Sequence, residues 1–133
     1  MRMNEKLFFL IMAFGLAISP LRAEAQLPYA ITDGEIAMLP KGCQVKLGKD
    51  PVANANWSER LGAETWMHMH HYCHGLKFIN RARFTINKVD RKYYLQNAIG
   101  EFDYCLTHWP ANSPMMREAQ REKSEVEAML IRH

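Results

Sequence analysis

The stretch that decides the fold is residues 91–110, RKYYLQNAIGEFDYCLTHWP. Apolar side chains recur in it at spacings of four, four, three and four residues, which is the period of an α-helix rather than of a strand. Asp90 is placed to cap this helix and Pro110 ends it, so we predict a helix from Arg91 to His108. The positions on its buried face are Tyr94, Ala98, Phe102, Cys105 and Trp109.

Helical patterns continue on both sides of this segment. On its N-terminal side, residues 63–84 carry two adjoining apolar stripes, so we predict a long helix that is covered on two sides. On its C-terminal side, Asn112 or Ser113 is placed to cap a third helix with Pro114 in its first turn. Because no segment after residue 26 alternates like a strand, the predicted fold class is all-α, with an antiparallel helical hairpin and a third helix.

The chain before residue 57 has a different pattern. Residues 26–56 are rich in Pro, Gly, Asp and Asn and show no sustained period, so we expect a mostly irregular N-terminal arm. Only residues 33–38 are expected to form a short turn of helix there. The six residues WSERLG, 57–62, have the pattern of a brief helix that Gly62 ends. The helical domain is therefore expected over residues 57–133.

The first 25 residues have the three regions of a secretory signal peptide. A basic start, MRMNEK, is followed by an apolar run over residues 7–16, and small residues stand at Ala23 and Ala25. We predict cleavage after Ala25 and export to a Gram-negative periplasm. The alternative is an uncleaved N-terminal anchor, although the apolar run is shorter than the roughly 20 residues that a spanning helix needs.

The overall composition and the absence of enzyme motifs exclude several classes of protein. Hydrophobic residues make up 48% of the 133 residues and charged residues 23%, with a net charge of +3. These values are typical of one globular domain rather than of a disordered, collagen-like or multi-span membrane protein. The sequence lacks GxSxG, HExxH and a phosphate-binding glycine loop. Cys73 and His74 are neighbours whose side chains diverge on a helix, so we expect no thiol catalysis and no enzymatic activity.

Six positive residues and a single negative one gather between residues 77 and 92. In a cytosolic protein such a run, interleaved with aromatic residues, indicates nucleic-acid binding. Because we expect the chain to be exported, we predict instead that the run surrounds a turn between two helices, where cations favour the C-terminal end of the first helix. An anionic partner surface or a lipid headgroup is the alternative. The cations are Lys77, Arg81, Arg83, Lys88, Arg91 and Lys92.

The three cysteines are interpreted through the predicted compartment, since an oxidising environment allows thiols to pair. Cys43 lies in the predicted irregular arm, whereas Cys73 and Cys105 lie on apolar faces of predicted helices. We predict a disulfide between Cys43 and Cys73, which would pin the arm and stabilise the fold by roughly 3–4 kcal/mol. Cys105 is then a buried free thiol. The alternative is three reduced, buried thiols.

Reactive side chains concentrate in residues 66–74, WMHMHHYCH. On a helix, His70 and His74 lie one turn apart on one face, and His71 lies three residues before His74, which is how two imidazoles meet one metal ion. Imidazoles with thioethers suit copper, and imidazoles alone suit zinc. The preferred interpretation is that no cofactor binds and that these side chains serve the core, hydrogen bonds or solvent. A third metal ligand would have to come from His108, His133 or Glu64.

Part of the sequence resembles a known repeat. Ala98, Phe102, Cys105 and Pro110 have the spacing of the second-helix positions of a tetratricopeptide repeat. Gly75 resembles the small residue of the first helix of that repeat. The resemblance implies that Gly75 lies where the two helices touch.

A longer stretch, from about residue 39 to residue 110, is similar to the N-terminal region of uncharacterised proteobacterial secreted proteins with tetratricopeptide-like repeats. Those proteins carry LPxxC followed by HHYCxGLxxxNRA. The resemblance implies a helical, protein-binding scaffold without known catalysis. The matching positions are Leu39, Pro40 and Cys43, then His70, His71, Tyr72, Cys73, Gly75, Leu76, Asn80, Arg81 and Ala82.

The expected function is that of a non-enzymatic periplasmic scaffold or accessory subunit that binds another protein or a protein complex. Contact is expected through the groove between helices or through an exposed apolar seam on the third helix. We expect no nucleic acid and at most peripheral contact with a membrane, and a homo-oligomer is compatible with the sequence. The alternative function is copper or zinc binding by the histidine segment. The seam consists of Met115, Val126, Met129 and Leu130.

Overall fold

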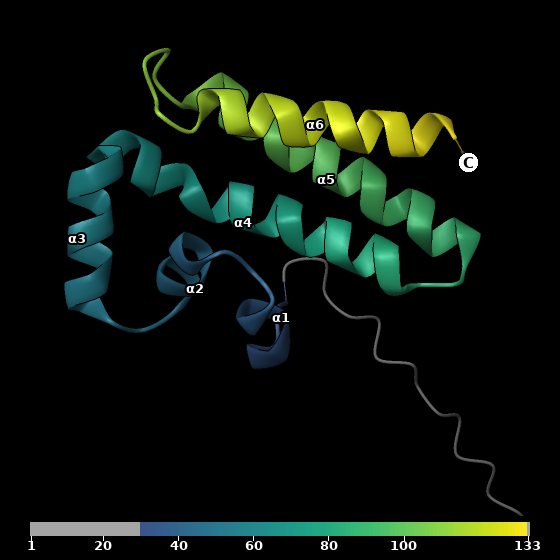
Figure 1. Ribbon diagram of the computed structural model, residues 1–133, viewed down its shortest axis with the longest axis horizontal. Helices are drawn as coiled ribbons and strands as arrows, with labels where there is room; N and C mark the ends of the chain where they lie inside the picture. Colours follow the sequence, from purple (N-terminus) through teal and green to yellow (C-terminus); the bar gives the residue numbers. More distant parts are fainter. Residues whose placement is uncertain (1–29, 133) are drawn as a thin grey trace, which may run out of the picture.

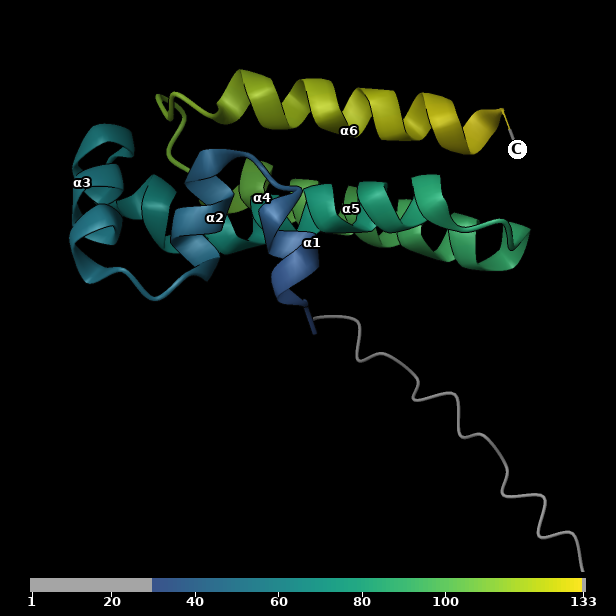
Figure 2. The same cartoon turned by 60° about the horizontal axis from the view of Figure 1, so that its bottom comes forward.

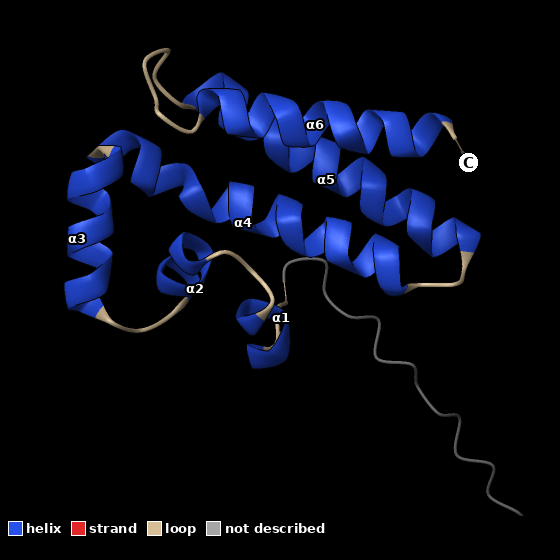
Figure 3. Ribbon diagram, in the orientation of Figure 1, coloured by secondary structure: helices blue, strands red, loops and turns tan. Residues whose placement is uncertain are grey.

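A computed structural model of the chain describes residues 30–132. The predicted signal peptide over residues 1–25, its cleavage point, the first residues of the predicted arm and His133 lie outside these residues. Within them the chain forms six α-helices and no strand, so the predicted all-α class is confirmed. Figure 3 shows these helices joined by loops. The helices are α1 (Asp33–Ala37), α2 (Lys41–Leu47), α3 (Pro51–Leu61), α4 (Ala63–Phe84), α5 (Lys88–His108) and α6 (Met116–Ile131).

Three long helices form the body of the molecule. α4, α5 and α6 follow one another through short connections and lie side by side, each antiparallel to the one before it (Figure 1). The most extensive packing is between α4 and α5, followed by that between α5 and α6. The smaller helices α2 and α3 pack against α4 (Figure 2), so this helix is covered on more than one side. The predicted helical hairpin with a third helix is therefore confirmed.

The expectation of an irregular arm over residues 26–56 is wrong for α2 and for the first part of α3. The Asp and Pro residues that suggested a loop instead mark the start of a helix. The Asp50 carboxylate accepts hydrogen bonds from two backbone N–H groups of the first turn of α3, both at 3.0 Å, and Pro51 occupies the first helical position. The brief helix that was expected to end at Gly62 is the last part of α3.

The short helical turn predicted at residues 33–38 is present as α1 and is attached to α4 by an ion pair. Thr32 and Glu35 form a reciprocal capping box at its start. Arg81 of α4 binds the same Glu35 carboxylate with two nitrogen atoms, at 2.6 Å from Nε and 3.1 Å from Nη2. This guanidinium holds the pKa of Glu35 below its usual value. One carboxylate therefore both caps α1 and fixes it to α4.

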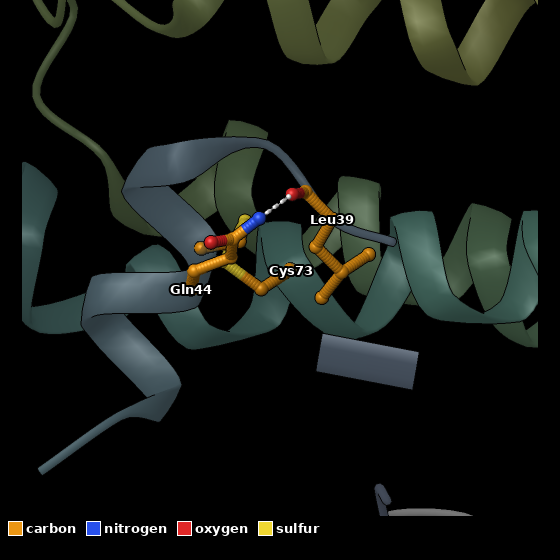
Figure 4. Close-up of a disulfide and its surroundings, with 4 residues drawn as sticks. Leu39, Gln44 and Cys73 are labelled. Atoms are coloured by element: carbon orange, nitrogen blue, oxygen red, sulfur yellow. Dashed lines mark hydrogen bonds between the residues drawn. A yellow bond between two sulfur atoms is a disulfide. The ribbon is translucent and has the colours of Figure 1, made fainter. Parts of the chain in front are cut away.

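The predicted disulfide joins α2 to α4. Cys43 and Cys73 are bonded with their Cα atoms 5.4 Å apart, and both are fully buried. Figure 4 shows the Gln44 amide beside this bond, where it donates a hydrogen bond of 2.8 Å to the Leu39 carbonyl and closes the turn before α2. Cys105 is a buried free thiol, and burial raises its pKa to about 12. The predicted pairing is confirmed.

The contact between α4 and α5 depends on a glycine. A Cβ atom on Gly75 would lie 2.7 Å from the Phe102 ring, a separation that real Cβ contacts essentially never show. Phe102 is fully buried, so its ring has no space into which to move. The missing side chain at Gly75 therefore sets how closely the two helices approach.

The core draws side chains from all three long helices and from α2. Four of the five positions predicted for the buried face of α5 are at most 4% exposed, and the fifth, Tyr94, is partly buried and packs against the core. Trp109 donates its indole N–H to the Thr65 carbonyl at 2.9 Å, so the polar atom of this buried ring is satisfied. The largest fully buried apolar side chains are Phe78, Phe102, Leu95 and Val126.

Removal of the disulfide by Cys43→Ala/Cys73→Ala is expected to lower the free energy of unfolding by about 3–4 kcal/mol, because the bond constrains the unfolded chain. It links residues separated by 30 positions. Urea unfolding of the parent and the double variant, each with and without reductant, measures the difference. Reductant should destabilise the parent and leave the variant unchanged. Equal midpoints for the two oxidised proteins would contradict this account.

Gly75→Ala is expected to lower the free energy of unfolding by about 1–2 kcal/mol, although alanine is the better helix former. The new methyl group would overlap a buried ring that cannot yield. Thermal and urea unfolding measure the effect, and Phe102→Leu in the Gly75→Ala background should recover part of the loss. A gain in stability from Gly75→Ala alone would show that the two helices separate freely.

Candidate functional site

The apolar seam predicted on α6 is turned toward the protein's own core. Val126 is fully buried, and Met115, Met129 and Leu130 are partly buried and pack against the core. α6 lies along α5, and a helix with one apolar stripe loses most contact with water when that stripe faces its neighbour. The expectation of an exposed seam is therefore wrong, and a binding surface has to be sought elsewhere.

Rings from the histidine segment of α4 and from the end of α5 form a continuous series of contacts, of which two are stacked and two are tilted. The ring centroids of His71 and Tyr104 are 3.6 Å apart, and those of Tyr104 and His108 are 3.8 Å apart. His70 lies against His71 at 4.2 Å, and His68 lies 5.5 Å from His108. We call these five residues the ring ladder. They join α4 to α5 on the outside of the helical hairpin.

The ring ladder is held in place by a buried carboxylate. His71 Nδ1 donates a hydrogen bond of 2.7 Å to Glu101 of α5, whose side chain is only 6% exposed. A carboxylate accepts and does not donate, so this bond places the proton on Nδ1 of the imidazole. Because a buried charge needs a partner, the pair also fixes the position of α4 relative to α5.

The structure does not assemble a metal centre from the predicted ligands. His70 places Nδ1 3.1 Å from the Met67 carbonyl, and His71 is engaged with Glu101. Within residues 30–132, no group of three or more His, Cys, Asp or Glu side chains is arranged to hold a metal ion. His74 lies one turn beyond His70, but among the described residues neither Glu64 nor His108 joins these imidazoles in a group of three, and His133 lies outside those residues.

Three imidazoles of the histidine segment have lowered pKa values. The pKa values of His68, His70 and His74 are lowered, first of all because burial disfavours the charged ring. For His74 the pKa falls to about 4, and the neighbouring Lys77 cation adds to the effect. This ring is therefore uncharged at neutral pH and gains a proton only in acid.

A shallow depression lies beside the ring ladder along the outer side of α5. It has a volume of about 510 Å³, and His71, Glu101 and Tyr104 connect it to the ladder. We call it the α5 depression. Sequence reasoning missed it, although its residues recur at helical spacing on the side of α5 opposite the predicted buried face. The residues that line it are His71, Tyr93, Gln96, Asn97, Gly100, Glu101 and Tyr104.

Gly100 makes no close packing contact with the described residues. It lies in the interior of α5, and a Cβ atom added to it would meet nothing within 4 Å. Glycine inside a helix is less favourable than alanine by roughly 0.5–1 kcal/mol. Gly75 offsets that penalty by allowing the contact with Phe102, whereas Gly100 gains no such contact within the described residues. The open backbone at Gly100 is therefore a feature of the surface.

Comparison with protein-family models, with curated proteins and with solved structures finds no match. Among the described helices, none is both long enough and apolar enough to cross a membrane.

Stability is expected to fall as the pH is lowered from about 6.5 toward 5.5. The unfolded pKa of histidine is 6.5, and the folded pKa of His74 is about 4, so the unfolded chain binds the additional proton in this range. Urea unfolding at pH 7.5, 6.5 and 5.5 measures the dependence. His74→Asn should reduce the slope by up to about 1.4 kcal/mol per pH unit. An identical slope in parent and variant would contradict the assignment.

Proposed function

We propose that this protein is a non-enzymatic helical scaffold that binds another protein through the α5 depression. The observation that carries the proposal is Gly100, an exposed glycine in the interior of a helix, where an added Cβ atom would meet none of the described residues within 4 Å. A residue without a Cβ allows another backbone to approach closely. Because Gly100 has no side chain, the surface of α5 leaves space there for a partner.

The chemistry of the depression suits a polypeptide segment. Tyr93 is 45% exposed and Tyr104 is partly buried, so two aromatic rings flank the open backbone. Aromatic residues of this kind supply much of the contact area at protein interfaces. Gln96 and Asn97 offer amide groups that can both donate to and accept from a main chain. We infer that a partner segment lies over Gly100 with its peptide groups toward these amides.

The floor of the depression is held rigidly, which favours binding. Asn97 donates its side-chain N–H to the Tyr93 carbonyl at 2.8 Å, and His71 and Glu101 connect the floor to α4. A surface that is already ordered loses less conformational entropy when a partner binds. The depression is therefore preorganised rather than formed by the partner.

The compartment is part of the same proposal. A buried disulfide is compatible with an oxidising compartment, and the N-terminal pattern of residues 1–25 predicts export. The close approach of Gly75 to Phe102 agrees with the tetratricopeptide-like spacing of the sequence. These observations support a periplasmic scaffold or accessory subunit whose partner is another protein of that compartment.

Gly100→Ala is expected to raise the free energy of unfolding by about 1 kcal/mol and to weaken binding of the partner. The added methyl group improves the helix and occupies the space reserved for the partner backbone. Unfolding in urea measures the first effect. The second is measured as the dissociation constant of a partner identified by cross-linking from Gln96 in the exported fraction of the cell.

Gly100→Leu and Ala128→Leu form a matched pair for the same test, since Ala128 is exposed on α6, away from the depression. Gly100→Leu should abolish cross-linking, and Ala128→Leu should leave it unchanged. Full retention of the partner by Gly100→Leu would overturn the proposal.

A further inference from the structure

One end of the helical bundle exposes large apolar side chains. Phe84 at the end of α4, Ile86 in the following loop, Val89 in the first turn of α5 and Ile131 at the end of α6 are between 73% and 97% exposed. Figure 1 shows that this end lies opposite α3. We call these four residues the bundle tip. Such a concentration of exposed apolar side chains marks an interaction surface.

The exposure does not come from a loosely held loop. Asn87, rather than the predicted Asp90, caps α5 by accepting hydrogen bonds from the backbone N–H groups of Val89 at 2.8 Å and Asp90 at 3.3 Å. Arg91 donates a hydrogen bond of 2.9 Å to the Thr85 carbonyl on the other side of the loop. The loop is therefore fixed from both ends while Ile86 projects from it.

The basic residues between positions 77 and 92 divide into two groups. Lys77 is buried with its ammonium 4.2 Å from the centre of the Phe78 ring, and Arg81 is bound to Glu35. The remaining cations form no ion pair within the part of the chain that the structure describes, and Lys88, Arg91 and Lys92 among them lie beside Val89 of the bundle tip. They are Arg83, Lys88, Arg91 and Lys92, with Arg132 at the end of α6.

A cavity of about 680 Å³ is lined by both apolar and basic side chains. It lies between the start of α5 and the end of α6. Its apolar lining comes from Val89, Leu95 and Leu130, and its basic lining comes from Lys88, Arg91 and Lys92. Cations around an apolar surface match a ligand that has an anionic head and an apolar body.

We propose that the bundle tip docks onto the surface of an anionic lipid bilayer. Ile86, Val89 and Phe84 enter the boundary between headgroups and acyl chains, and Lys88 and Lys92 lie against lipid phosphates. The exposed apolar residues belong to a loop and two helix ends and project from the molecule. A fluid lipid surface accepts such projections, whereas an acidic protein would need pockets shaped to receive them.

Sedimentation with vesicles tests this proposal on the exported form of the chain, whose N-terminus is established by intact mass. Vesicles of phosphatidylcholine are compared with vesicles in which roughly one third of the lipid is phosphatidylglycerol. The chain should partition onto the anionic vesicles and less so at high salt. Lys88→Ala/Lys92→Ala should weaken partitioning about 25-fold, since each cation near the surface contributes about fivefold.

Ile86→Ser/Val89→Ser should weaken partitioning at least about tenfold, because two apolar side chains no longer enter the bilayer. Matched controls replace residues exposed elsewhere on the molecule. Val52→Ser/Met67→Ser and Lys41→Ala/Lys49→Ala should partition like the parent. Circular dichroism should show unchanged unfolding midpoints in all four variants.

Three results would overturn the proposal. Equal partitioning onto neutral and anionic vesicles would remove the role of the cations. Equal losses of partitioning in the tip variants and their controls would show that the bundle tip is not the membrane-binding surface. Binding to soluble polyglutamate without binding to anionic vesicles would identify an acidic protein as the partner instead. Gly100→Leu should leave partitioning unchanged, so this test is independent of the proposed function.

Discussion

The close approach of α4 and α5 at Gly75 is the constraint on which the rest of the structure depends. It allows Phe102 to fill the space between the helices, and it brings His71 within 2.7 Å of Glu101. The same approach stacks His71 on Tyr104, so the ring ladder and the α5 depression both inherit their geometry from one missing methyl group. The disulfide and the ion pair at Glu35 then attach the smaller helices to this frame.

Much of the fold could be predicted because its signals are local or follow from the compartment. The period of residues 91–110 identifies α5, and the predicted oxidising compartment motivates the pairing of Cys43 with Cys73. Asp50 could not be interpreted in the same way, since aspartate both caps helices and occurs in loops. Amphipathicity at Val126 shows that α6 has an apolar face but does not identify what covers it. The importance of Gly100 depends on knowing that no described residue lies above it, which only three-dimensional structure provides.

The two proposed surfaces use different physical principles. The α5 depression combines a rigid floor with aromatic and amide groups, so recognition there depends on the shape and hydrogen bonds of the partner. The bundle tip combines projecting apolar side chains with cations. It requires a fluid, charged surface rather than a surface whose shape is complementary to its own. Because the first surface lies along α5 and the second at the end of the bundle, the two proposed interactions do not compete for the same residues.

The burial of Cys105 has a consequence for how the protein matures. Three cysteines permit three different single bridges, and an incorrect bridge is corrected by attack of a thiolate. The pKa of about 12 leaves Cys105 with almost no thiolate at neutral pH, and the thiol is enclosed between α4 and α5. These two helices are adjacent in sequence, so their hairpin can form before the distant Cys43 is oxidised. It follows that formation of the hairpin removes Cys105 from thiol exchange and leaves Cys43 and Cys73 to pair.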